Sequence, residues 1–189
     1  MKSQRFSRAI LGVAIATVVI LSIPLVAMQF TSEVNWSLSD FVIMGAILFG
    51  TGTALVALLR QSTHLAYKVG VAVGLGTTFF MIWANLAVGL IGSGPHAGNL
   101  MFMGVFAVCA VGIIRSHFKA MGMSRAMYAS ALSVIVVGVI ALLAGMDKYH
   151  ASSVGEILAV TGFFTVLYAV AGYAFQFAAH DQTAAASSN

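Results

Sequence analysis

The fold is decided by the stretch from residue 69 to residue 114, which reads VGVAVGLGTTFFMIWANLAVGLIGSGPHAGNLMFMGVFAVCAVGII and contains no Asp, Glu, Lys or Arg. A helix rises about 1.5 Å per residue, so about 20 residues cross a hydrocarbon layer about 30 Å thick. These 46 residues are therefore long enough for two crossings. The turn-forming segment 92–99, GSGPHAGN, divides them into two spans.

The rest of the chain has the same character. Of its 189 residues 60% are hydrophobic and 7% are charged, whereas soluble domains keep about a quarter of their residues charged. Four further uncharged runs cover residues 9–30, 41–59, 126–146 and 157–180. They are apolar on every face, which favours helices over the alternating strands of a barrel. Water-soluble and disordered proteins are both excluded.

We predict an all-α, polytopic membrane helix bundle that forms a single domain over residues 1–180. Its six transmembrane helices are expected at about 9–30, 41–59, 69–92, 99–118, 126–146 and 156–179. The polar Ala/Ser segment 181–189 is expected to be a disordered tail. The first apolar run follows three basic residues, as in a signal peptide, but it is longer than a cleaved signal and lacks a convincing cleavage site. We therefore expect a retained helix, kinked at Pro24.

The basic residues predict the orientation. With six spans, eight of the nine lie on one side: Lys2, Arg5, Arg8, Arg60, Lys68, Arg115, Lys119 and Arg125. The other side holds Lys148 and the acidic residues Glu33, Asp40, Asp147 and Glu156. Short cytoplasmic loops carry an excess of Lys and Arg, so both termini are expected in the cytoplasm. The same distribution explains the net charge of +4; it indicates contact with lipid headgroups and no nucleic-acid partner.

Polar residues near the outer ends of the spans are the candidate binding residues. Asp40, Asn85, His96, Asn99 and Glu156 are expected to converge there, roofed by Trp36 or Trp83. Asn85 is expected to be the most deeply buried of these residues, because an amide in hydrocarbon is tolerated only where it meets hydrogen-bond partners. The Gly-rich loop that carries His96 is expected to fold over it, because the backbone of such a loop is permissive. The alternative is that they act separately: Asp40 and Glu156 as helix caps, Asn85 as a clasp between helices, and Trp36 in an aromatic belt.

Other chemistry finds little support in the residues. His64 and His117 could meet at the inner ends of two spans, but the helix interiors lack the paired histidines of a haem protein. His96 and His150, with Asp40 or Glu156, could form a His/carboxylate metal site, but their spacing in the sequence does not indicate one. Cys109 is the only cysteine, which excludes an internal disulfide. We therefore predict no catalytic residues, no metal and no cofactor.

Small residues in the second, third and fifth spans are expected to let helices approach closely. The third span holds the pair Gly70 and Gly74, followed by Gly76. Because short loops force neighbouring helices together, we expect these faces to pack within one chain, although contact between copies stays open.

One segment resembles a known family. Trp83, Asn85, Ala87-Val88-Gly89, Ile91-Gly92-Ser93 and then Asn99-Leu100-Met101 are similar to a run in an uncharacterised family of small bacterial multi-pass inner-membrane proteins. The pairs Asn35-Trp36 and Asp40-Phe41, and Gly122-Met123 before Arg125-Ala126, look like features of the same family. Where the family has acidic residues after the serine, this chain has Gly94-Pro95. The resemblance implies a six-helix protein of the bacterial cytoplasmic membrane and no mechanism.

Three classes of function remain open. The first is binding or transport of a small solute or ion through the outer polar residues. The second is a non-catalytic accessory subunit of a larger membrane complex, and the third, which ranks last, is a membrane enzyme. The lipid bilayer is the expected partner, and a homo-oligomer or a complex partner is possible.

Overall fold

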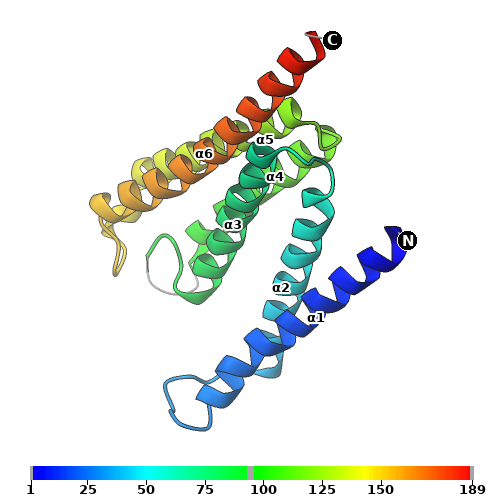
Figure 1. Cartoon of the computed structure of the whole chain (residues 1–189). Coiled ribbons are helices and arrows are strands. Elements are labelled where there is room, and N and C mark those ends of the chain that lie inside the picture. The colour runs from blue at the N-terminus through cyan, green and yellow to red at the C-terminus, as the bar shows by residue number, and fades with distance from the viewer. Residues whose placement is uncertain (1, 93–95, 188–189) are drawn as a thin grey trace. The chain divides into compact units, whose positions relative to one another are not determined.

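The computed structural model describes residues 2–92 and 96–187, and every regular element in them is a helix (Figure 1). The elements are α1 (Lys2–Ala27), α2 (Leu38–Leu59), α3 (Leu65–Ala87), the 3₁₀ turn η1 (Ala97–Met101), α4 (Phe102–Arg115), α5 (Ala120–Leu143), the 3₁₀ turn η2 (Met146–Lys148) and α6 (Val154–Ser187). Six segments are long and apolar enough to cross a membrane: Phe6–Ala27, Leu38–Leu59, Leu65–Ala87, Ala97–Arg115, Ala120–Leu143 and Val154–Ala184. The predicted all-α fold with six candidate spans is confirmed, and the protein is a multi-pass membrane protein.

Several helices begin a few residues before the uncharged runs, and at α2 and α6 polar side chains cap the helix start. At α2, the hydroxyl of Ser37 accepts a hydrogen bond from the Asp40 amide at 3.3 Å, and the Asp40 carboxylate accepts one from the Ser37 amide at 2.7 Å. This reciprocal pair satisfies two amides that a helix start leaves without partners. The helix therefore starts at Leu38, and Asp40 lies in its first turn.

The last helix is longer than the sequence analysis expects. α6 continues to Ser187, so the first seven residues of the predicted disordered tail are helical. No Gly or Pro interrupts this segment, and alanine, which is frequent in it, is the best helix former. Ser188 and Asn189 lie outside the described residues.

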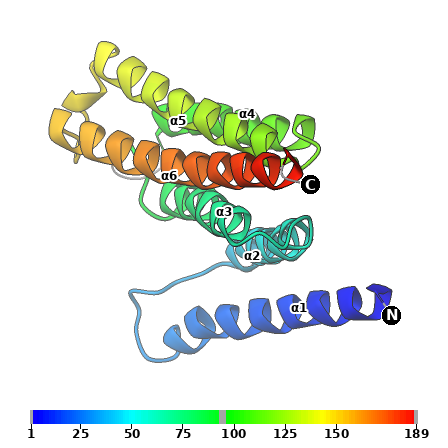
Figure 2. The ribbon, with the colours of Figure 1, turned by 45° about the horizontal axis from the view of Figure 1, so that its top comes forward.

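The chain forms two compact units, Met1–Arg60 and Gln61–Asn189. The expectation of a single domain over residues 1–180 stays a prediction. In the first unit α1 and α2 form a hairpin (Figure 2). Two glycines on one face of α2 permit the contact: a Cβ added at Gly52 would lie 2.6 Å from Val13, and one at Gly45 would lie 3.3 Å from Leu21. Small residues on α2 thus bring the two helices of this unit together.

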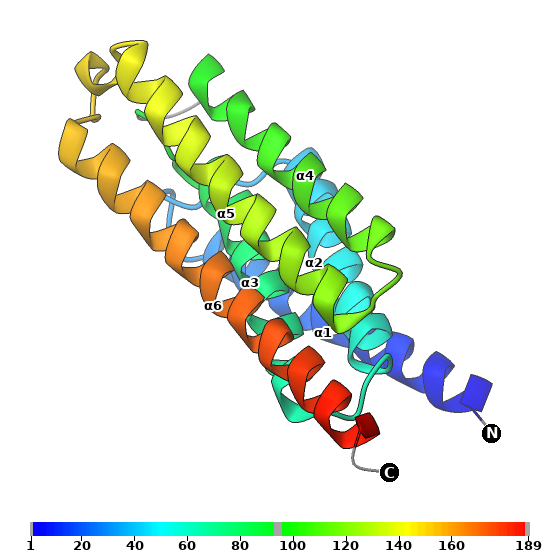
Figure 3. The ribbon, with the colours of Figure 1, turned by 90° about the horizontal axis from the view of Figure 1, so that it is seen from above.

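In the second unit α5 packs along α6, α6 packs along α3, and α4 packs along α5 (Figure 3). The glycine pair of α3 faces this interior. A Cβ at Gly70 would lie 2.9 Å from the Phe175 ring, and one at Gly74 would lie 2.7 Å from the Met127 sulfur. At these two glycines the expected packing within one chain is confirmed, whereas a Cβ added at Gly76 would meet no atom within 4 Å.

Candidate functional site

Asn99 fastens the segment that follows α3 to the start of the fourth span. Its Oδ1 accepts hydrogen bonds from the amides of Leu90 and Ile91, both at 2.9 Å, and its Nδ2 donates to the Ile91 carbonyl at 3.2 Å. The side chain is only 7% exposed. Buried polar groups are normally satisfied in this way, so the side-chain amide of Asn99 is already used by backbone groups.

Two other predicted residues lie in the same region. The Nδ2 of Asn85 donates to the Asn99 carbonyl at 3.1 Å, so Asn85 is directed at η1, while its buried Oδ1 has no hydrogen-bond partner in the described part of the chain. The Nδ1 of His96 accepts from the Gly98 amide at 3.0 Å, and the His96 ring lies 4.2 Å from that of Tyr149. The structure therefore brings Asn85, His96 and Asn99 together.

Glu156 and Trp83 make local contacts. Glu156 accepts a hydrogen bond from the Ser153 hydroxyl at 3.1 Å, and its own amide donates to that hydroxyl at 3.2 Å, which is a helix cap on α6. Trp83 is 42% exposed and stacks on Phe80 with ring centroids 5.8 Å apart.

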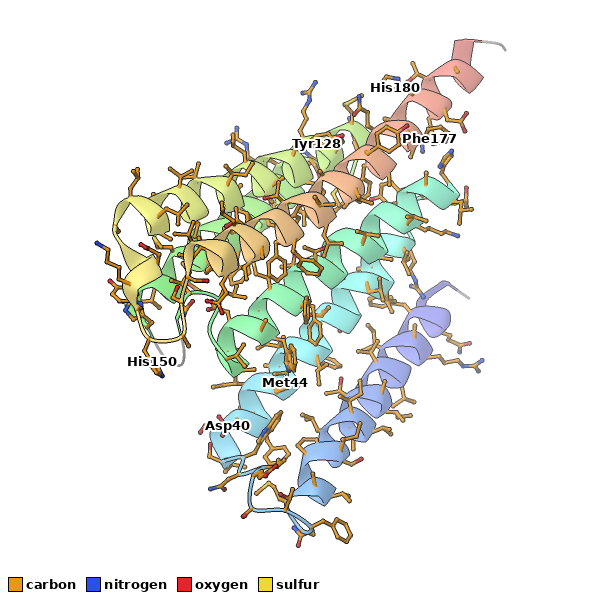
Figure 4. All side chains as sticks on the ribbon, turned by 90° about the vertical axis from the view of Figure 1, so that its left-hand side faces the viewer. Asp40, Met44, Tyr128, His150, Phe177 and His180 are labelled. Carbon is orange, nitrogen blue, oxygen red and sulfur yellow. The ribbon has the colours of Figure 1, made fainter. Side chains whose placement is uncertain are left out.

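Asp40 and Trp36 belong to the first unit. Asp40 is bonded to Ser37 at the start of α2, where Figure 4 labels it, and the Trp36 ring lies 5.2 Å from that of Phe41. The convergence of these two residues with Asn85, His96, Asn99 and Glu156 stays a prediction. What the structure shows for Asp40 and Glu156 is that each caps its own helix.

A buried polar cluster that the sequence analysis missed lies inside the second unit. The hydroxyl of Thr78 donates to the Gly74 carbonyl at 2.9 Å and lies 3.0 Å from the hydroxyl of Tyr168 and 3.8 Å from the sulfur of Cys109. Because the Thr78 proton is used by the carbonyl, Tyr168 donates to Thr78. Tyr168 is fully buried, so this hydrogen bond joins α3 to α6 in the interior.

The second unit also has a large opening, which we call the loop pocket. Its volume is about 670 Å³, within the usual range for ligand sites. Three segments line it: Gln61, Ser62 and Tyr67 before and in α3; residues 117–121, which connect α4 to α5 and begin α5; and Ala179, Gln182 and Thr183 in α6. Most of these side chains are polar or basic, unlike those of the spans.

A strained turn shapes the loop pocket. His117 and Phe118 have φ angles of 47° and 61°, in the left-handed region that costs non-glycine residues energy. The Tyr67 hydroxyl donates to the Phe118 carbonyl at 2.9 Å, and the Ser116 hydroxyl accepts from the Phe118 amide at 3.0 Å. A Cβ at Gly122 would lie 2.7 Å from Ser116, so only glycine permits this approach. Strain that is held in place by its surroundings is typical of functional segments.

Positive charge is available at the loop pocket. Among the described side chains, the His64 Nε2 lies 2.7 Å from the Asp181 Oδ2, and no carboxylate lies within ion-pair distance of the Lys119 ammonium. Lys119 also precedes α5 without capping its first turn. The amides at that helix start carry a partial positive charge. The sequence analysis missed this site, because a single His followed by a Phe does not specify a left-handed turn at His117 and Phe118.

The histidines are dispersed. His150 and His180 lie at opposite ends of the second unit (Figure 4), while His64 contacts Asp181 and His117 lines the loop pocket. Over the described ranges, no group of three His, Cys, Asp or Glu side chains is arranged to hold a metal ion.

Comparison with known proteins does not identify a family. No protein-family model, no curated protein and no solved structure matches this chain. The functional argument therefore depends on the geometry described above.

Proposed function

We propose that this multi-pass membrane protein binds a small polar solute in the loop pocket. The observation that carries the proposal is the pocket itself, a space of about 670 Å³ in which polar and basic side chains from three segments lie beside a few apolar ones. Ligand sites are concave and hold a few convergent polar groups on a scaffold that is already formed. The helix ends of the second unit and the bonded turn at Phe118 supply such a scaffold.

The predicted outer cluster is a weaker candidate. The side chain of its most buried member, Asn99, is hydrogen-bonded to the backbone of Leu90 and Ile91, and Glu156 caps α6. The free oxygen of Asn85 is the main remaining acceptor there. Binding or transport of a solute is the first class of function expected from the sequence. The loop pocket, at the opposite end of the second unit, supports this class better than the outer cluster does.

We infer that the loop pocket faces the cytoplasm of a bacterial cell. Eight of the nine basic residues lie on the side that carries the termini in a six-span topology, and Lys119 of the loop pocket is one of them. The resemblance to small bacterial inner-membrane proteins supports the same placement. Both termini are then cytoplasmic, and the solute enters from the cytoplasm.

The test is a thermal-melting screen in mild detergent with sugars, amino acids, carboxylates and phosphate esters. Gln182→Trp places a large ring at the wall of the loop pocket, and His180→Trp is the matched control, because His180 is an exposed neighbour outside the lining. We expect at least one compound to stabilise the native protein and His180→Trp but not Gln182→Trp. A screen in which no compound distinguishes these proteins contradicts the proposal, and a stoichiometric protein that co-purifies would favour the accessory-subunit alternative.

A further inference from the structure

The last turns of α6 have little packing to hold them. Ala178 is fully buried, but Ala179 is only half-buried and residues 180–184 are all exposed. The end of this helix continues past the neighbouring helices of the second unit (Figure 1). A segment with few buried contacts opens more readily than the interior of a protein. Packing alone therefore does not fix the position of these turns.

The same turns form one wall of the loop pocket. Gln182 and Thr183 line the pocket and directly follow Asp181 in α6. Across from them in the chain, Gln61 and Ser62 line the pocket just before His64, the residue that precedes α3. The α6 wall thus exists only while an exposed helix end stays beside the segment that leads into α3.

A hydrogen bond joins these two segments next to the lining residues. The Nε2 of His64 lies 2.7 Å from the Oδ2 of Asp181, across 117 positions of the chain. An ionised carboxylate only accepts hydrogen bonds, so the His64 ring donates to it, and it can do so in either its neutral or its protonated form. The contact therefore ties the exposed end of α6 to the start of α3 without depending on the charge of the histidine.

We propose that the His64–Asp181 hydrogen bond is a latch that keeps the α6 wall of the loop pocket in place. This inference rests on the proposed function, because it makes the latch a determinant of ligand binding. When the latch opens, the terminal turns of α6 move and the pocket loses Gln182 and Thr183 as a wall. Apparent affinity falls in proportion to the fraction of molecules that have the wall in place. A solute that contacts this wall favours the closed latch in turn, because such coupling is reciprocal.

The experiment measures hydrogen–deuterium exchange of the purified full chain in detergent, without added ligand. His64→Ala breaks the latch and leaves the sequence of α6 unchanged, and His64 makes no side-chain cap on α3 that would be lost with it. Asp181→Ala breaks the same contact from the other side. His180→Ala is the matched control, because His180 is an exposed neighbour of Asp181 in the same helix (Figure 4). Amides 168–178 of α6 report whether each variant keeps its fold.

We expect His64→Ala and Asp181→Ala to speed the exchange of amides 180–184 about twofold to fivefold, which is the effect of losing one exposed pair. Exchange of amides 168–178 should stay as in the native protein, and His180→Ala should behave like the native protein throughout. The double variant should exchange no faster than either single variant, because both remove one contact. Helix propensity predicts the opposite for Asp181→Ala, since alanine is a better helix former than aspartate.

Four results would overturn the latch: unchanged exchange at 180–184 in His64→Ala, an equal increase in His180→Ala, additive increases in the double variant, or an equal increase over 168–178. The proposed function is judged separately by the melting screen. If a compound still distinguishes the native protein from Gln182→Trp while exchange is unchanged in His64→Ala, the binding site stands and only the latch fails. If the latch is observed but no compound of the screen binds, the proposed function fails.

Discussion

A substitution of Asn99 tests whether the predicted outer residues have a structural role or a binding role. Asn99→Leu keeps a similar volume but removes the three hydrogen bonds to Leu90 and Ile91, whose donor–acceptor distances are 2.9, 2.9 and 3.2 Å. Each bond contributes about 1 kcal/mol, and each backbone group left unsatisfied can cost about 1–3 kcal/mol. We therefore expect the substitution to lower the free energy of unfolding by about 3 kcal/mol or more.

Asn85→Leu is the matched comparison. It removes one hydrogen bond, to the Asn99 carbonyl at 3.1 Å, but it also removes the Asn85 Oδ1, which is buried without a partner. The two effects offset each other, so the expected loss is at most about 1 kcal/mol. Unfolding is followed by titration with a denaturing detergent in mixed micelles. Equal losses in the two variants, or a loss at Asn99→Leu below about 0.5 kcal/mol, would refute the reasoning, because three buried bonds cannot be so weak.

Two further substitutions test the interior of the second unit in the same assay. Tyr168→Phe removes the hydrogen bond to Thr78 at 3.0 Å, and we expect it to cost about 0.5–1.5 kcal/mol, the usual net contribution of one intramolecular hydrogen bond; no loss would mean that the pair does not join α3 to α6. Gly112→Ala would place a Cβ 2.7 Å from the Ala126 Cβ and 3.1 Å from its Cα, which forces α4 away from α5 at a cost of about 1–3 kcal/mol. Gly104→Ala, where the Cβ meets nothing within 4 Å, is the control and is expected to be neutral or slightly stabilising, so equal effects at both glycines would contradict the packing.

The six spans could be predicted from the sequence because a bilayer demands long uncharged segments, and residues 69–114 satisfy that demand twice. The helix caps at Asp40 and Glu156 were also predictable, since each follows a serine by three residues and such contacts are local. The packing role of Gly70 and Gly74 followed from their spacing.

Contacts between distant segments could not be predicted in the same way. The Thr78–Tyr168 hydrogen bond joins residues 90 positions apart, and Tyr67 reaches the Phe118 carbonyl across 51. The loop pocket depends on the left-handed turn at His117 and Phe118. The sequence does not predict this turn, because Phe rarely adopts that conformation and a single His, although enriched in it, does not specify it. The length of α6 was missed for a different reason: an Ala/Ser composition is compatible with both a disordered tail and a helix.

The most direct test of the account asks whether the loop pocket is open to the cytoplasm. Met121→Cys places a thiol at the pocket wall, and Tyr149→Cys places one at the opposite end of the second unit, while the native Cys109 is buried and stays silent. A membrane-impermeant maleimide is added to inside-out and right-side-out vesicles from a bacterial host. The account predicts that Met121→Cys is labelled only in inside-out vesicles and Tyr149→Cys only in right-side-out vesicles. Labelling of both from the same side, or of Met121→Cys in neither preparation, would contradict it.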